Sequence, residues 1–187
     1  MIGKKATRFS QKQILEARAV ALAQAPQEKN QIDQTINLIS FHLGKETLGI
    51  PTSFVFDTQP LKTLNWSKVP SAPPYITGVV NFHSHIFSIT NLAIFFGFSP
   101  LSITEQTHLL LLKGGKCDDG KEMEMTILSD DLPTIKSIQK NDIFPPDENI
   151  KSSLSYYLKG ITPDLLSVID IELLLSDPRL IIQELDV

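Results

Sequence analysis

The chain has two patterns of apolar and polar positions: a helical period near its start and a period of two from about residue 35 onward. Ser10 and Gln13 have the form of a capping box, which predicts a helix over about 11–24 that ends before Pro26. The apolar stripe of this helix consists of Ile14, Ala17, Ala21 and Ala25. The polar residues that follow, up to 34, are typical of a linker.

Alternating apolar residues then predict a series of short strands. The segments 37–43 and 46–51 are predicted to pair as a hairpin around the turn Gly44-Lys45. Further extended segments are predicted at 53–58, 76–82 and 86–90, with a proline-rich loop at 67–74.

After a short predicted helix, the second half of the chain again has the pattern of short strands. Asn91 is expected to cap this helix over 92–96, and Gly97 to end it. Strands are predicted at 107–113, 122–128, 132–138, 156–161 and 165–171, and a closing helical turn at 172–175. If extended, the adjacent Tyr156 and Tyr157 point to opposite faces, so they form either a contact surface or one core and one exposed ring. Short strands at regular spacing predict a β-barrel or a pair of barrels.

The size and composition fit a globular protein of 187 residues, 42% hydrophobic and 20% charged. That length suits one domain, or two small subdomains that share a core. The single cysteine, Cys117, excludes an internal disulfide framework and fits a reducing compartment. No apolar run reaches the roughly 18 residues of a membrane span, and the polar start lacks the apolar stretch of a secretory signal. We therefore expect a cytoplasmic protein without membrane insertion.

The charge is unevenly distributed. Residues 1–29 contain six basic and two acidic side chains, a net of +4, so the total of −4 leaves −8 for the rest of the chain. An acidic body argues against nucleic acid as a partner. The basic start either contacts an acidic partner or membrane surface or, as we favour, is a solvated tail.

Residue patterns typical of enzymes are weak. The glycines at 114, 115 and 120 lack the context of a phosphate loop, and no Gly-x-Ser-x-Gly elbow is present. Acidic neighbours disfavour Cys117 as a nucleophile. Four acidic residues offer either a carboxylate pair for acid–base chemistry or, as we favour, solvated side chains: Asp118, Asp119, Asp130 and Asp131. We expect no enzyme and no cofactor.

His83 and His85 lie two positions apart, so on a strand they would share one face and offer two metal ligands. No third ligand is evident nearby, and a metal site needs a full ligand set. We therefore expect no metal, and favour two polar residues on an exposed strand face or at a partner surface.

Several segments carry apolar strands with glycines at set positions. Segment 38–50 is an apolar strand that ends in Leu-Gly, with a partner strand that carries Gly-Ile; Val55 to Thr58 follows, and 129–132 reads Ser-Asp-Asp-Leu. The segment Pro74–Leu92 contains Pro-x-x-Ile-x-Gly-Val-x-Asn and ends in Ile-x-Asn-Leu. The closing segments are Tyr-Leu-Lys-Gly-Ile at 157–161 and Val-Ile-Asp-Ile-Glu-Leu-Leu at 168–174. Their order and spacing over about 35–176 resemble the CheW family, the adaptors of bacterial chemotaxis.

The resemblance implies a mainly β fold of two five-stranded, SH3-like barrels that share a core. The CheW-like domain would span 35–176, with subdomains interleaved around about 35–100 and 101–176. The basic helix and linker at 1–34, which resemble an extension of some members, would precede it, and a tail at 177–187 would follow.

The resemblance also implies a non-enzymatic adaptor. Its partners would be the regulatory domain of a CheA-type histidine kinase and the cytoplasmic tip of a methyl-accepting chemoreceptor, in arrays at the inner membrane face. The family's central Arg-Gly is His83-Ser84 here, so a mostly neutral imidazole replaces a guanidinium. Candidate receptor-side residues are Val55, Asp57, Asn81, His83 and Ser84. The alternatives are an adaptor of a non-flagellar array, such as one for pilus motility, or a β-barrel that senses a small ligand or metal.

Overall fold

The computed structural model describes residues 34–114, 122–146 and 152–180. The chain forms two units, Met1–Thr35 and Ile36–Val187, and the second holds almost every described residue. The predicted N-terminal helix and the loop that contains Cys117 lie outside the described residues.

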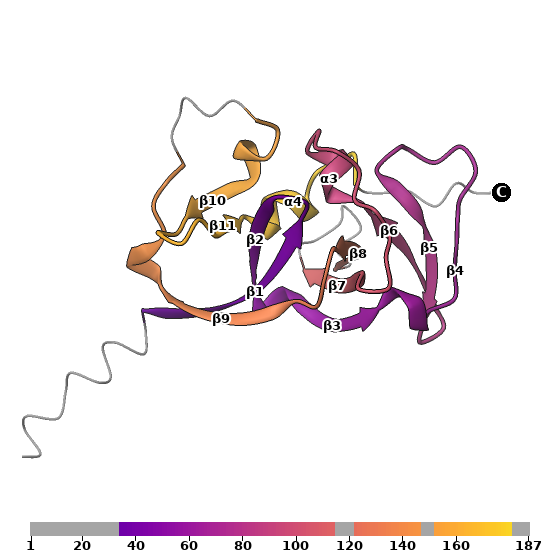
Figure 1. The fold of residues 1–187 in the computed structure, drawn as a ribbon, viewed down its shortest axis with the longest axis horizontal. Coiled ribbons are helices and arrows are strands. Elements are labelled where there is room, and N and C mark those ends of the chain that lie inside the picture. Colours follow the sequence, from indigo (N-terminus) through magenta and orange to yellow (C-terminus); the bar gives the residue numbers. More distant parts are fainter. Residues whose placement is uncertain (1–33, 115–121, 147–151, 181–187) are drawn as a thin grey trace, which may run out of the picture. The chain divides into compact units, whose positions relative to one another are not determined.

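The first sheet joins strands that are far apart in the sequence, in the spatial order β10-β11-β2-β1-β9 (Figure 1). Its strands are β1 (Thr35–Leu43), β2 (Glu46–Pro51), β9 (Thr134–Gln139), β10 (Leu158–Ile161) and β11 (Ser167–Ile169). The β1–β2 hairpin turns at Gly44, whose φ of 62° suits glycine, and so confirms the predicted turn. β11 runs parallel to β2, with Ser167 opposite Leu48.

The second sheet takes the middle of the chain, in the order β3-β7-β8-β6-β5-β4. Its strands are β3 (Val55–Pro60), β4 (Trp66–Ser67), β5 (Ile76–Phe82), β6 (His85–Thr90), β7 (His108–Gly114) and β8 (Met123–Ser129). Most neighbours are antiparallel, but β6 and β8 run parallel, with Ile89 opposite Thr126. Neighbouring strands of the second sheet are therefore not always consecutive along the chain.

The mainly β fold with two sheets agrees with the prediction, and one detail differs. The second sheet has six strands rather than five, because Ser67, which was predicted to lie in a loop, pairs with Val79 beside the pair Trp66–Val80. The first sheet combines β1 and β2 with β9, β10 and β11, so its strands come from both halves of the chain.

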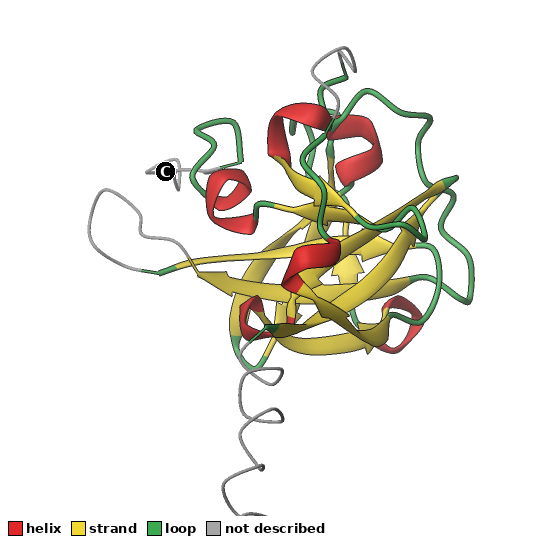
Figure 2. Cartoon of the chain, turned by 90° about the vertical axis from the view of Figure 1, so that its left-hand side faces the viewer, coloured by secondary structure: helices red, strands yellow, loops and turns green. Residues whose placement is uncertain are grey.

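Helices are short pieces at the margins of the strands (Figure 2). The expected cap is present: Asn91 Oδ1 accepts hydrogen bonds from the backbone N–H of Ala93 (3.1 Å) and Ile94 (3.4 Å) at the start of α3 (Leu92–Phe95). Asp170 caps α4 (Ile171–Leu175) in the same way.

Four 3₁₀ turns complete the helical segments of the part of the chain that the structure describes. They are η1 (Thr52–Phe54), η2 (Leu61–Thr63), η3 (Lys140–Asp142) and η4 (Ser155–Tyr157). The first and last replace the starts of segments that the sequence predicted as extended. In η4 Tyr157 is 2% exposed and Tyr156 is 68% exposed, so one ring is core and the other surface. No helix among the described residues is long and apolar enough to cross a membrane.

One large apolar cluster joins the two sheets. It contains Phe41 and Ile50 from the first sheet together with Leu110 and Ile127 from the second, all with no exposed surface. A much smaller cluster of Leu38, Leu166 and Val168 lies on the first sheet alone. The shared cluster matches the common core that the sequence predicted.

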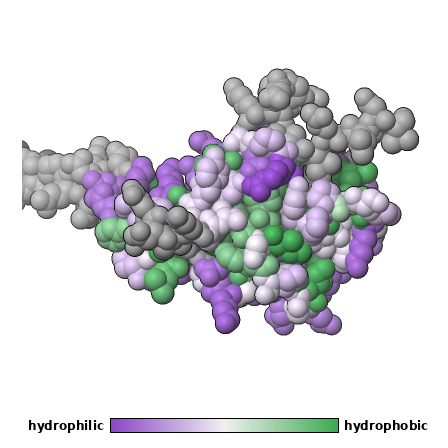
Figure 3. Space-filling model, turned by 90° about the horizontal axis from the view of Figure 1, so that it is seen from above, coloured by the Kyte–Doolittle hydropathy of each residue, from purple (hydrophilic) through white to green (hydrophobic). Residues whose placement is uncertain are grey.

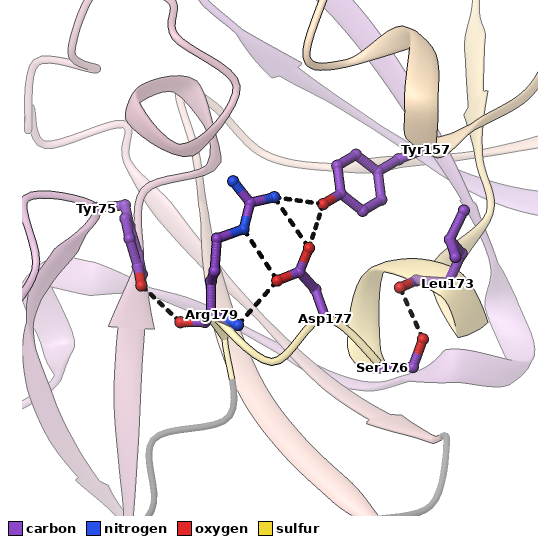
Figure 4. A network of polar contacts seen from close by, with 6 residues as sticks. All are labelled: Tyr75, Tyr157, Leu173, Ser176, Asp177 and Arg179. Carbon is purple, nitrogen blue, oxygen red and sulfur yellow. Dashed lines mark hydrogen bonds and ion pairs between the residues drawn. The ribbon is translucent and has the colours of Figure 1, made fainter.

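The turn after α4 is attached to this body by polar contacts (Figure 4). The guanidinium of Arg179 donates to the Tyr157 hydroxyl (2.6 Å) and to both carboxylate oxygens of Asp177 (2.9 and 3.0 Å), while it lies 4.5 Å from the Phe95 ring centroid. The Tyr75 hydroxyl donates to the backbone oxygen of Arg179 (2.5 Å). The sequence predicted Asp177 and Arg179 as the start of a tail. These contacts instead hold them against Tyr75, Phe95 and Tyr157.

Two pKa values change in this turn. The Arg179 hydrogen bonds lower the pKa of Asp177 to about 2. Burial, followed by the hydrogen bond to Asp177, raises the pKa of Tyr157 to about 12. At neutral pH the turn therefore contains a carboxylate, a guanidinium and a neutral phenol that satisfy one another.

Candidate partner-binding surface

A bulge on β3 holds two of the residues that the sequence singled out. Val55 lies opposite Leu112 and Asp57 opposite Leu111, so Phe56 is the extra residue between them. The Phe56 ring is 46% exposed, which is unusual for a phenylalanine. A bulge that redirects an aromatic ring toward solvent is typical of a strand that contacts another molecule.

Asp57 is already engaged by its own strand. Its carboxylate accepts hydrogen bonds from the backbone N–H of Thr58 (2.7 Å) and from the side-chain amide of Gln59 (3.1 Å to each oxygen). The side chain is partly buried. Asp57 therefore stabilises the shape of the bulge while it leaves part of the carboxylate accessible to a partner.

The β5–β6 hairpin ends in a two-residue turn with left-handed backbone at both positions. His83 has a φ of 49° and Ser84 a φ of 66°, the geometry that favours asparagine and glycine. Both side chains are exposed. This geometry gives a physical reason for the glycine that the family motif has at position 84, and serine carries a steric cost there.

His83 and His85 do not form the shared strand face that the sequence suggested. His83 lies in the turn and His85 begins β6, so strand alternation does not relate them. The His83 ring instead packs edge-on against Phe82, with centroids 4.1 Å apart. No group of three potential ligands is present among residues 34–114, 122–146 and 152–180, and His83 and His85 belong to none.

Aromatic contacts bring the bulge and the hairpin together. The ring centroids of Phe56 and Phe87 are 6.3 Å apart, and those of His85 and Phe87 are 6.4 Å apart. Phe87 lies opposite Val80, three positions from the hairpin turn, and is buried. The buried Phe87 ring therefore lies near both the exposed Phe56 ring on β3 and the His85 ring at the start of β6.

Asn81 lies on the other face of the hairpin. It is opposite Ile86, which is 74% exposed. Because side chains alternate along a strand, this pair points away from the face that holds Val80 and Phe87. The outer side of the hairpin thus offers a partner Asn81 and an exposed isoleucine, whereas Val80 and Phe87 on the other side are buried.

Sequence reasoning missed two exposed apolar side chains, Phe56 at the bulge and Ile86 on the hairpin. The alternation of apolar and polar residues places both side chains on strands. It does not show which face of each strand the rest of the protein covers, so the exposure of these two residues could not be predicted. Other exposed apolar residues lie elsewhere, and the face seen from above shows apolar areas between polar ones (Figure 3). The exposed apolar residues outside the candidate surface include Leu132, Ile135, Phe144, Tyr156 and Leu165.

The fold and this surface define a mainly β, two-sheet protein whose candidate site consists of exposed apolar and polar side chains. The chain belongs to the family described as the CheW-like domain, whose family model matches residues 37–179. The match spans both sheets and ends at Arg179, so it includes the turn after α4.

Relatives of known name are similar over most of their length. The chain is 24% identical over 167 residues to "Chemotaxis protein CheW" of Helicobacter pylori, which covers 88% of this chain and 95% of that protein. It is 25% identical over 151 residues to "Chemotaxis protein CheW" of Treponema pallidum, covering 79% and 86%. The low identity marks a divergent member of the family.

A solved structure shows the same fold. The scaffolding protein TtCheW from Thermoanaerobacter tengcongensis superposes with a TM-score of 0.62 at 19% identity, covering 74% of this chain and 86% of that one. The likeness supports the arrangement of the two sheets.

Proposed function

We propose that this protein is a non-enzymatic adaptor that couples chemoreceptors to a CheA-type histidine kinase. The observation that carries the proposal is the family match over residues 37–179, supported by named relatives of nearly full length. Within the described residues, the candidate surface offers exposed side chains for a partner and no cluster suited to a metal. The protein works in the cytoplasm, at receptor arrays on the inner face of the membrane.

Each sheet curls toward an SH3-like barrel in this proposal. Phe56 on β3 and Phe87 on β6 lie close together although two strands separate β3 from β6 in the second sheet. In the first sheet, Lys136 on the edge strand β9 forms an ion pair (3.2 Å) with Asp164, in the β10–β11 turn at the opposite edge. Contacts between distant strands of one sheet support curled sheets rather than flat ones.

The surface around the bulge and the hairpin tip is the receptor side in this proposal. Val55 and Asp57 flank Phe56 along β3, and the Phe56 ring lies near Phe87 of the β5–β6 hairpin, whose tip holds His83 and Ser84. A partly exposed aromatic anchor with a polar rim is typical of small interfaces. Such contacts are weak one by one, and arrays strengthen them because many are made at once. Replacement of the family's arginine by His83 supports a receptor other than the usual one, such as that of a pilus-motility array.

The experiment is a pair of calorimetric titrations of the full chain, one with the regulatory domain of a CheA-type kinase from the same organism and one with its receptor-tip fragment. We expect micromolar binding to the kinase domain that is unchanged in His83→Arg and Phe56→Asp. Receptor-tip binding should weaken roughly tenfold or more in Phe56→Asp, because a charge then replaces an aromatic ring that binding would bury. Val55→Asp should weaken it as well. Leu132→Asp, at a more exposed apolar residue outside the candidate set, should change neither.

The two outcomes separate the parts of the proposal. No binding to any such kinase domain of the organism would refute the coupling role. Kinase binding together with receptor-tip binding that is indifferent to Phe56→Asp and Val55→Asp would retain the adaptor and reject this surface as the receptor side.

A further inference from the structure

The first sheet contributes to two apolar clusters. Phe41 and Ile50 belong to the shared core, whereas a separate small cluster has Leu38, Leu166 and Val168 as buried members. On β2, a Cβ at Gly49 would contact Leu38 and Leu166 at 3.1–3.3 Å, so this small cluster is closely packed. The end of the sheet beside this cluster is open.

That open end is a hollow of about 500 Å³. It lies where β1, β2, β10 and β11 meet the turn after β9, and it is lined by Ile36, Pro51, Lys140, Ile143, Lys159 and Val168. Ile36 and Ile143 also pack against the small cluster, so the floor of the hollow is continuous with the core of the sheet. The volume falls within the roughly 300–1,000 Å³ of small-ligand sites, which occur at the mouths of curled sheets.

Among the described residues that line this hollow, the charged side chains have one sign: they are those of Lys140 and Lys159. Among residues 34–114, 122–146 and 152–180, no carboxylate forms an ion pair with either ammonium group, whereas Lys62, Lys113 and Lys136 each have an acidic partner. Two like charges beside an apolar floor favour an occupant that combines an anionic head with an apolar body.

We propose that this hollow binds a small amphipathic carboxylate, with its chain on Ile36, Ile143 and Val168 and its head group between Lys140 and Lys159. The site is separate from the receptor-side surface, which lies on the second sheet. The sequence suggested a small-ligand site on the face of His83 and His85. The hollow is a different location for such a site. The proposal does not depend on which kinase or receptor the adaptor binds.

The test uses delipidated full-length protein and three probes of equal chain length: octanoate, octan-1-ol and octylammonium. Binding is followed by calorimetry and by amide shifts of Ile36 and Val168 in heteronuclear NMR spectra. We expect saturable binding of octanoate, weaker binding of octanol and none of octylammonium. The double variant Lys140→Gln, Lys159→Gln should weaken octanoate binding roughly tenfold or more, because charge-assisted hydrogen bonds are lost, and should leave octanol unaffected.

Two further variants make the result specific. Lys62→Gln, Lys68→Gln removes two exposed lysines outside the hollow and should bind octanoate like the parent protein. Ile36→Trp, which fills the hollow and keeps both charges, should abolish binding. Equal binding of octanoate and octylammonium, indifference to the Lys140 and Lys159 changes, or no saturable binding of octanoate would overturn the proposal. Saturable binding of an acetylated peptide of alternating leucine and aspartate, without any of octanoate, would overturn it in favour of a protein segment.

Discussion

At the scale of single residues, the hairpin tip shows how family motifs follow from backbone geometry. His83 and Ser84 adopt left-handed conformations that only a few residue types take without cost. The turn persists because β5 and β6 pair over their whole length on either side of it. A strained turn at an exposed surface is where a partner contact is expected, since stability alone would select glycine or asparagine.

Replacing Ser84 by glycine should stabilise the protein. The left-handed conformation costs an L-residue roughly 1–2 kcal/mol, and after the greater chain entropy of glycine we expect a net gain of about 0.5–1 kcal/mol. Chemical denaturation measures it. The matched change Ser88→Gly, within β6, should destabilise by a similar amount, and stabilisation by both or by neither would contradict the role of the left-handed turn.

A feature could be predicted from the sequence when it depends only on residues that are close together along the chain. Gly44 at a turn and Asn91 at a helix start act on neighbours one to three positions away, so both features were predictable. The exposure of Phe56 was not, because it depends on a bulge that forms only when β3 pairs with β7. The hollow was not predictable either, since its lysines come from η3 and β10 and meet only in the folded sheet.

At the scale of elements, the turn after α4 makes the C-terminal end of the described chain part of the body. It connects to α3 through Phe95, to η4 through Tyr157 and to the start of β5 through Tyr75. The sequence indicated only a tail there, because Asp177 and Arg179 have no apolar periodicity. Their partners are about 20 and 100 residues away along the chain, beyond the reach of local patterns.

The stability contributed by this turn should depend on pH in one direction. The pKa of Asp177 is lowered from 3.8 to about 2, so its contribution is present above pH 4 and is lost as the pH falls from about 4 to 2. We expect Asp177→Asn to destabilise by about 1–2 kcal/mol at pH 7, a range reduced for the solvent exposure of Arg179. Thermal unfolding at pH 7, 4 and 2.5 should show this difference shrink at the lowest pH. Asp142→Asn, at an exposed carboxylate, should show no such trend.

At the scale of the whole molecule, the two sheets share one large core. Ile127 on β8 has no exposed surface and belongs to the cluster that also contains Phe41 and Ile50 of the first sheet. Parallel pairs, β2 with β11 and β6 with β8, further connect distant parts of the chain. Such pairings could not be predicted from the sequence, because apolar periodicity identifies strands but does not show which of them are neighbours in a sheet.

Ile127→Ala should therefore weaken both sheets together. We expect a loss of about 3 kcal/mol for a large-to-small change in a closed core. Hydrogen exchange should show equal loss of protection for the amides of β2 and β7, as one cooperative unit. Loss confined to the second sheet would show that the two sheets unfold separately.

The interleaved first sheet has a consequence for synthesis of the protein. β1 and β2 emerge from the ribosome first, yet their partner β11 is the last strand to be made. The second sheet, whose strands are all complete by Ser129, can assemble on the nascent chain while the edge of β2 that pairs with β11 still lacks its partner. That edge exposes unpaired backbone groups until β11 is made, and a chain cut short before Ser167 would keep the hairpin without this neighbouring strand.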